Sequence, residues 1–124
     1  MDGSAILVVC LCAAWCRLCD EYSPVLDSVT SELFDGDRQL HRCWIDIEDD
    51  ADLVGDFDVE TFPTIVVIGT DDVRFAGPLT PQADTLRRVL RATVVDAPAH
   101  ARWPAVSPEI EAFAARLRGR LRLA

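Results

Sequence analysis

Two cysteines separated by two residues, Cys16 and Cys19, are the side chains of this sequence best suited to chemistry. They follow an apolar run and precede a helical pattern, so we expect Cys16 at a helix N-terminus and Cys19 one turn deeper. Unpaired backbone N–H groups there, with Arg17 alongside, favour a Cys16 thiolate. This spacing is typical of a reversible dithiol/disulfide pair in which Cys16 attacks and Cys19 resolves. A buried, inert pair or half of a metal site would use the same spacing.

The elements that position these cysteines can be predicted from the apolar pattern. Residues 5–12 are apolar on both faces, which predicts a central strand buried between two layers of helices in a mainly parallel sheet. A helix is predicted over residues 16–34, with Pro24 expected to kink it. Further strands are predicted at residues 41–47, 64–68 and 73–76, the last two as a hairpin.

Three more helices are expected from capping residues. Asp49-Asp50 can cap a short helix that carries Leu53, Val54 and Phe57, and Thr80-Pro81 predicts the start of another, with N-cap and first-turn proline. After a Pro- and Ala-rich linker, Ser107-Pro108-Glu109 predicts a last helix. Its expected apolar stripe consists of Ile110, Phe113, Ala114, Leu117 and Leu121.

Two motifs together resemble the thioredoxin family. These are Ala14-Trp15-Cys16-x-x-Cys19 and Phe57-Asp58-Val59-x-x-Phe62-Pro63-Thr64, and the resemblance covers roughly residues 4–95. It implies an α/β, thioredoxin-like three-layer sandwich. Only four residues precede the first strand, so we expect a mixed sheet of about four strands that lacks the family's usual first strand and helix. We interpret residues 1–95 as this domain and residues 96–124 as a linker and amphipathic helix packed on it.

The resemblance also implies a substrate-binding surface beside the two sulfurs. In the family the proline of the second motif is cis, which would bring the backbone of Phe62 beside the cysteines to pair with an extended substrate. The residues expected to bind substrate are Trp15, Arg17, Phe62, Pro63 and Gly77. An ordinary trans turn at Pro63 and a purely core role for Trp15 are the alternatives.

The sequence departs from the family pattern where protons are handled. Cys10 occupies the position of a buried Asp, and Trp44 that of its Lys partner. The proton of Cys19 would then pass to water or to a carboxylate such as Asp46 or Glu48. Leu18 replaces the proline usual between the cysteines, a change that tunes the redox potential.

Three cysteines lie outside the motif. Cys10 and Cys12 share a strand face, where a mutual disulfide is disfavoured, so we interpret both as small core residues. Alternatively, one is a regulatory thiol with Cys43 as its partner. A zinc site of Cys16, Cys19, Cys43 and His41 has suitable ligand types, but strand residues should point into the core, so we predict no metal site and no bound cofactor.

Charge and composition narrow the class of function. The net charge of −9 argues against nucleic-acid and anionic-membrane partners, and the basic residues 96–124 could dock on the acidic remainder. No signal peptide or membrane span is recognised, and the clustered cysteines suggest a reducing compartment, so we expect a cytoplasmic protein.

These observations predict a thiol-disulfide oxidoreductase that reduces protein disulfides, acting as a monomer or weak dimer. Electrons would come from an external donor, in the family usually a flavin-dependent reductase. A non-catalytic binding or assembly module and a disulfide oxidase or isomerase are the alternatives.

Overall fold

The computed structural model describes residues 6–13, 16–34, 40–57, 59, 63–69, 72–80, 82–97 and 102–121. Its elements in chain order are β1 (Ile6–Cys12), α1 (Arg17–Phe34), β2 (Leu40–Asp46), α2 (Ala51–Val54), β3 (Thr64–Ile68), β4 (Val73–Pro78), α3 (Ala83–Leu90), the π-helix η1 (Arg91–Val95) and α4 (Pro108–Arg120). The strands and helices expected from the apolar pattern are all present, with ends shifted by at most three residues.

The four strands form one mixed sheet in the order β2-β1-β3-β4. Strand β1 is parallel to β2 and antiparallel to β3, and β3 pairs with β4 as an antiparallel hairpin. Every residue of β1 except Ile6 is buried, because the strand has neighbours on both edges and helices on both faces. The predicted central strand and the four-stranded mixed α/β sheet are therefore confirmed. The expectation of a mainly parallel sheet was wrong, because only the pairing of β1 with β2 is parallel.

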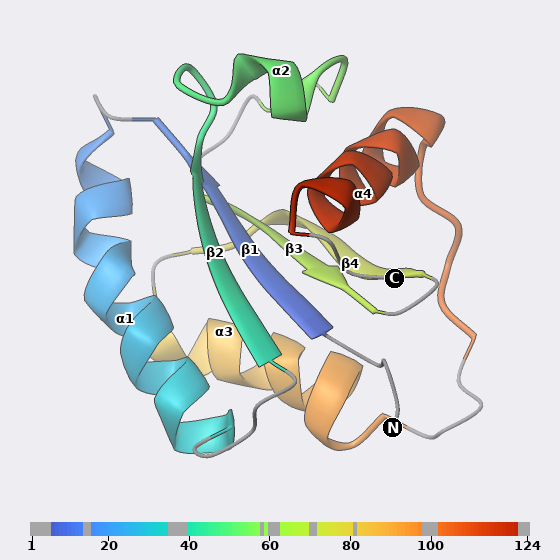
Figure 1. Ribbon diagram of the computed structural model, residues 1–124. Coiled ribbons are helices and arrows are strands. Elements are labelled where there is room, and N and C mark those ends of the chain that lie inside the picture. The colour runs from blue at the N-terminus through green and yellow to red at the C-terminus, as the bar shows by residue number, and fades with distance from the viewer. Residues whose placement is uncertain are drawn as a thin grey trace.

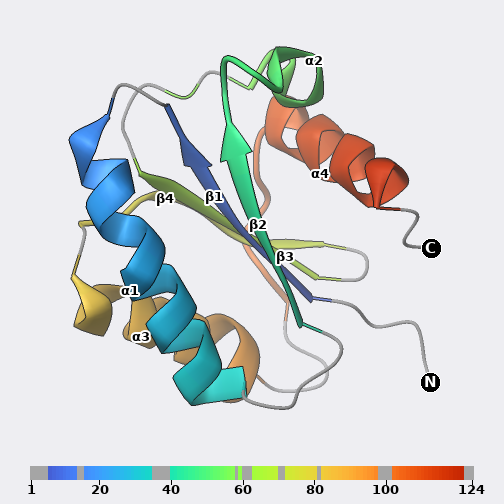
Figure 2. The same ribbon diagram turned by 60° about the vertical axis from the view of Figure 1, so that its left-hand side comes forward.

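Helices cover both faces of the sheet (Figures 1 and 2). Alternate residues of β1 point to opposite faces, which separates the core into two clusters. Helices α1 and α3 bury one cluster, which contains Val8, Cys10, Cys12, Cys19, Tyr22, Leu26, Leu86 and Leu90. Helices α2 and α4 bury the other, which contains Leu7, Val9, Leu11, Leu53, Val54, Phe113, Ala114 and Leu117.

Helix α4 packs on the sheet face opposite α1 and α3 (Figure 1). Phe113 is fully buried, and its ring centroid lies 5.6 Å from that of Phe57. The expected stripe is buried at Phe113, Ala114 and Leu117, and Ile110 is partly buried. Leu121 is 40% exposed, so its assignment to the stripe was wrong, since the helix ends at Arg120.

Only one of the three predicted caps forms. The Ser107 hydroxyl accepts a hydrogen bond from the Ile110 N–H at 3.3 Å, with Pro108 in the first turn. Asp50 is the N-cap residue of α2, but its side chain makes no capping bond and instead accepts from Arg120 at 2.8 Å.

The predicted start of α3 at Thr80-Pro81 was also wrong. The helix begins at Ala83 with Gln82 as its N-cap residue. The Gln82 N–H donates to the Thr80 carbonyl at 2.7 Å, and the Thr80 hydroxyl contacts that of Thr85, so a turn precedes the helix. Pro81 lies outside the described residues.

Arginines of α4 join it to the rest of the molecule. Arg116 donates to the carbonyl oxygens of Leu53 and Val54 at 2.8 and 2.9 Å, at the end of α2. Arg118 donates to the carbonyls of Gly69 and Asp72, which flank the β3–β4 turn. The basic segment thus docks largely through carbonyl oxygens, whereas charge counting had suggested carboxylates.

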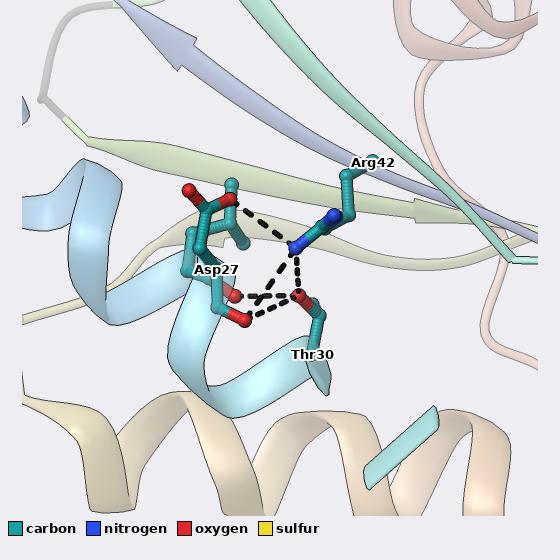
Figure 3. Close-up of polar contacts among 4 residues, drawn as sticks. Asp27, Thr30 and Arg42 are labelled. Carbon is teal, nitrogen blue, oxygen red and sulfur yellow. Dashed lines mark hydrogen bonds and ion pairs between the residues drawn. The ribbon is translucent and has the colours of Figure 1, made fainter. Parts of the chain in front are cut away.

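Strand β2 forms one edge of the four-stranded sheet, as expected. Figure 3 shows Arg42 reaching from β2 to α1, where its guanidinium lies 3.3 Å from both the Asp27 carboxylate and the Thr30 hydroxyl. This contact ties the edge strand to the helix that begins at the cysteines.

Candidate functional site

The cysteines gather where β1 ends and α1 begins. Cys12 is the last residue of β1, and Cys16 immediately precedes α1. The Cys16 N–H donates to the Ala13 carbonyl at 3.0 Å, and the Cys19 N–H donates to the Cys16 carbonyl at 3.2 Å. The bond between Cys16 and Ala13 holds the N-terminal turn of α1 close to the carboxyl end of the central strand.

The structure contains a disulfide between Cys12 and Cys19, with Cα atoms 5.8 Å apart. Both cysteines are only 1% exposed, whereas Cys16 is a free, partly exposed thiol. The pair present is therefore not the expected Cys16–Cys19 pair, and the interpretation of Cys12 as an unbonded core residue was wrong. The cause is the strand alternation, which points Cys12 to the face that α1 covers with Cys19.

Cys10 is the core residue that the sequence predicted. It is fully buried, and its Sγ atom lies 3.4 Å from that of Cys12. Burial raises the pKa of the Cys10 thiol to about 12, because an uncharged sulfur is favoured in the apolar core. Cys10 therefore stays protonated at neutral pH.

Cys43 lies on the other face of the sheet from Cys10 and Cys12. It pairs with Val9 and packs in the cluster beneath α2 and α4. Burial raises the pKa of its thiol. The alternative of a disulfide between Cys43 and Cys10 or Cys12 is therefore wrong. Within the described part of the chain, no group of three or more His, Cys, Asp or Glu side chains could hold a metal ion.

Tyr22 places a polar group in the same buried cluster. The side chain is fully buried, and its hydroxyl has no hydrogen-bond partner among the described residues. Burial is the main cause that raises the pKa of Tyr22, and the nearby Cys10 raises it further. The hydroxyl is therefore an unused, uncharged donor near the sulfurs, and the sequence analysis did not single it out.

The predicted substrate-binding residues are only partly described. Leu11 pairs with Thr64, so Pro63 lies at the same end of the sheet as Cys12. Pro63 is buried, and its carbonyl accepts from the Leu79 N–H at 3.3 Å. Gly77 lies on β4, one strand further from Cys12, where it pairs with Ile65 of β3.

Arg17 is the one other predicted binding residue that the structure describes. Arg17 is exposed at the start of α1, where Leu18 is 45% exposed. Trp15 and Phe62 lie outside the described residues, so their roles and the cis form of Pro63 stay predictions.

The candidate proton acceptors differ in how they are bound. The Asp46 carboxylate accepts from the backbone N–H groups of Glu48 and Asp49 at 2.8 and 3.2 Å, which ties it into the turn after β2. Glu48 is exposed, and Trp44 is 42% exposed on the edge strand. Neither carboxylate contacts a cysteine through a described hydrogen bond, so the proton acceptor stays a prediction.

A cavity of about 510 Å³ lies beside α2 and α4, across the sheet from Cys12 and Cys19. It is lined by Asp56, Phe57, Ser107, Glu109 and Ile110.

No helix among the described residues is both long and apolar enough to span a bilayer.

Comparison with known proteins identifies related folds. The family model for thioredoxin matches residues 1–92. The Deadhead thioredoxin of Drosophila melanogaster superposes with a TM-score of 0.59 at 17% identity, covering 69% of this chain and 78% of that one. The thioredoxin of Fasciola hepatica gives 0.58 at 19% identity, with the same coverage. The zinc-bound form of human ERp44 gives 0.59 at 16% identity, covering 72% of this chain but only 27% of that one. No curated protein sequence matches the chain significantly.

Proposed function

This chain belongs to the thioredoxin family, and from that premise we propose that it reduces protein disulfides through a mixed disulfide formed at Cys16. The fold, with four cysteines at one end of the sheet, supports thiol-disulfide chemistry in general. The observation that carries the finer proposal is the position of Cys16. It is a free and partly exposed thiol one helical turn from buried Cys19.

The reaction consists of two exchanges that conserve electrons. The Cys16 thiolate attacks one sulfur of a substrate disulfide, that S–S bond breaks, and the other substrate sulfur leaves as a thiolate. With Cys19 reduced, its thiolate then attacks the Cys16 sulfur and releases the second substrate thiol. Two electrons have moved from the cysteine pair to the substrate, and an external dithiol or reductase must restore them.

Substrate recognition is proposed at the strand end beside Cys12. Pro63 lies at that end, and pairing of an extended substrate with the backbone before Pro63, which the family resemblance implies, is part of the proposal. Arg17 and Leu18 are exposed beside Cys16 and would contact the substrate around the disulfide. The family resemblance and the clustered thiols support a reducing, cytoplasmic setting, which stays part of the proposal.

Single-turnover reduction of insulin tests this function. The chain is reduced with dithiothreitol, freed of reductant and mixed with insulin, whose liberated thiols are then counted. We expect Cys16→Ser to lower the rate by about 100-fold or more, because its hydroxyl is a poor nucleophile. Cys43→Ser is the control, since Cys43 lies across the sheet, and it should keep the wild-type rate.

Two outcomes would redirect the proposal. A wild-type chain that does not reduce insulin, yet shows a reversible two-electron couple in glutathione buffers, would indicate an oxidase or isomerase. A chain with no such couple would be a binding module. Cys19→Ser is the reference for that titration, because Cys16→Ser retains the two cysteines that are bonded in the structure.

A further inference from the structure

We propose that Cys12 is a third catalytic cysteine, which competes with Cys16 for the sulfur of Cys19 and switches the site between two forms. In one form Cys16 and Cys19 make the exchanging pair. In the other, the Cys12–Cys19 disulfide leaves Cys16 as a single free thiol, as the structure shows. This inference rests on the proposed function, because it concerns how that same site is regulated.

Cys19 lies within reach of two possible partners. Cys12 approaches it from the end of β1 and is bonded to it, with a Cα separation inside the range that disulfides span. Cys16 approaches it along the helix, since the Cys19 N–H donates to the Cys16 carbonyl at 3.2 Å. One sulfur can bond only one of them, so the two pairs exclude each other.

Interchange between the forms needs no further oxidant. The Cys16 thiolate attacks the Cys19 sulfur, the bond between Cys19 and Cys12 breaks, and Cys12 leaves as a thiolate that takes a proton. The reverse step restores the Cys12–Cys19 bond. The number of disulfides is unchanged, and the first one comes from a protein disulfide reduced by Cys16 and Cys19.

The burial of each sulfur favours the form in the structure. A disulfide is uncharged and suits the apolar core, where Cys12 and Cys19 are each only 1% exposed. It leaves the free thiol at Cys16, the partly exposed position, where a thiolate can be solvated.

The opposite form would leave a free Cys12 sulfur in the core. That sulfur would lie against the Cys10 sulfur, in the cluster that also holds the unpartnered Tyr22 hydroxyl. The Cys10 thiol, whose sulfur lies 3.4 Å from the Cys12 sulfur, is therefore the group in contact with Cys12 when it leaves.

The switch has a functional consequence for the mixed disulfide. When Cys19 is bonded to Cys12, a substrate captured by Cys16 finds no free thiol one turn away to resolve it. The mixed disulfide then persists until a reductant opens the Cys12–Cys19 bond. Under oxidising conditions, bonding of Cys12 to Cys19 thus changes Cys16 from a thiol that turns over its substrate into one that retains the substrate as a mixed disulfide.

Peptide mapping tests whether the buried bond forms without Cys16. Cys16→Ser is oxidised in a glutathione buffer, free thiols are blocked with N-ethylmaleimide in denaturant, which exposes the buried Cys10 thiol, and trypsin cuts after Arg17. This cut places Cys19 on a different peptide from Cys10 and Cys12. We expect the two peptides to remain linked, with Cys10 blocked. Unlinked peptides, or a bond from Cys19 to Cys10, would overturn the proposal.

A second experiment measures capture in the whole chain. In the same oxidising buffer, wild type should retain glutathione on Cys16, and Cys12→Ala should release it by forming Cys16–Cys19. We expect at least a fivefold difference in the retained fraction. Cys43→Ala removes a cysteine on the opposite face of the sheet and should behave like wild type. Equal retention in wild type and Cys12→Ala would refute the switch.

The two proposals fail in different ways. If wild type reduces insulin but the mapping finds no Cys12–Cys19 bond, only the switch is lost. If wild type reduces no insulin while the bond forms, the proposed reduction of protein disulfides fails, although the buried disulfide exists.

Discussion

At the scale of single residues, the cysteines near the site differ in reactivity because they differ in burial. Cys10, Cys12, Cys16 and Cys19 lie within ten residues of sequence, yet one is a buried thiol, two form a disulfide and one is a partly exposed thiol. Alternation along β1 and one turn of α1 decide which sulfurs face the core. Reactivity at this site is therefore a property of position.

The raised pKa of Cys10 predicts its labelling by iodoacetamide. The value of about 12 is higher than the ordinary 9.0, so the thiolate appears only at high pH. At pH 8 about one thiol in 10⁴ is ionised. We expect the Cys10 labelling rate in the reduced chain to rise about tenfold per pH unit from 7 to 10. Mass spectrometry of labelled peptides measures it, and a plateau below pH 10 would contradict the assignment.

At the scale of elements, short contacts at helix ends hold the layers in place. Gly55 ends α2 with φ of 60°, and the guanidinium of Arg116 from α4 occupies the space where a Cβ atom would lie. The same guanidinium holds the carbonyls of Leu53 and Val54. A left-handed glycine therefore permits the joint between α2 and α4.

A pair of glycine substitutions tests this joint. Gly55→Ala should lower the free energy of unfolding by about 1–2 kcal/mol, because it strains a left-handed residue and displaces Arg116. Gly119→Ala in α4 meets no atom within 4 Å and should raise stability by about 0.5–1 kcal/mol. Urea unfolding measures both, and changes of the same sign would argue against the joint.

The cap of α4 can be tested in the same way. Ser107→Ala removes the acceptor of the Ile110 N–H and should cost about 1 kcal/mol of unfolding free energy. Ser31→Ala, an exposed position inside α1, makes no capping bond and should cost nothing, since alanine favours a helix. Equal losses at the two positions would show that the cap is not the cause.

At the scale of the whole molecule, α4 closes a sheet face that four strands and α2 would leave open. Its buried residues Phe113, Ala114 and Leu117 pack on the same cluster as Leu7, Val9 and Leu11 of β1. Cys10, Cys12, Cys16 and Cys19 lie across β1 from this cluster. Stability of the strand that ends at Cys12 thus depends on a helix nearly a hundred residues later in the sequence.

Phe113→Ala tests how strongly the fold depends on α4. The side chain is fully buried against Phe57, so its loss should cost about 3–5 kcal/mol of unfolding free energy. Leu121→Ala, at a 40% exposed position just after the same helix, should cost under about 0.5 kcal/mol. Deleting residues 97–124 should likewise lower the melting temperature. An unchanged melting temperature would show that α4 does not stabilise the sheet.

Local physics was enough to determine much of this protein from its sequence. The apolar run of residues 5–12 could only be a strand buried on both faces, and the pattern after Cys16 could only bury one side of a helix. Ser107-Pro108 set the start of α4 because a cap and a first-turn proline act within a few residues. These signals, with two motifs, were sufficient to identify the family and its sheet.

The tertiary structure alone decided which sulfur bonds Cys19. Spacing favoured Cys16, since two cysteines one turn apart are neighbours in any helix. The bond to Cys12 depends on how α1 lies across β1, and no local pattern records that packing. The position of Cys43 on the opposite face of the sheet also depends on how the elements pack. So do the backbone carbonyls that accept hydrogen bonds from Arg116 and Arg118. Periodicity predicts on which face of its own helix or strand a residue lies. The residue that it contacts on another element depends on how the elements pack in the folded chain.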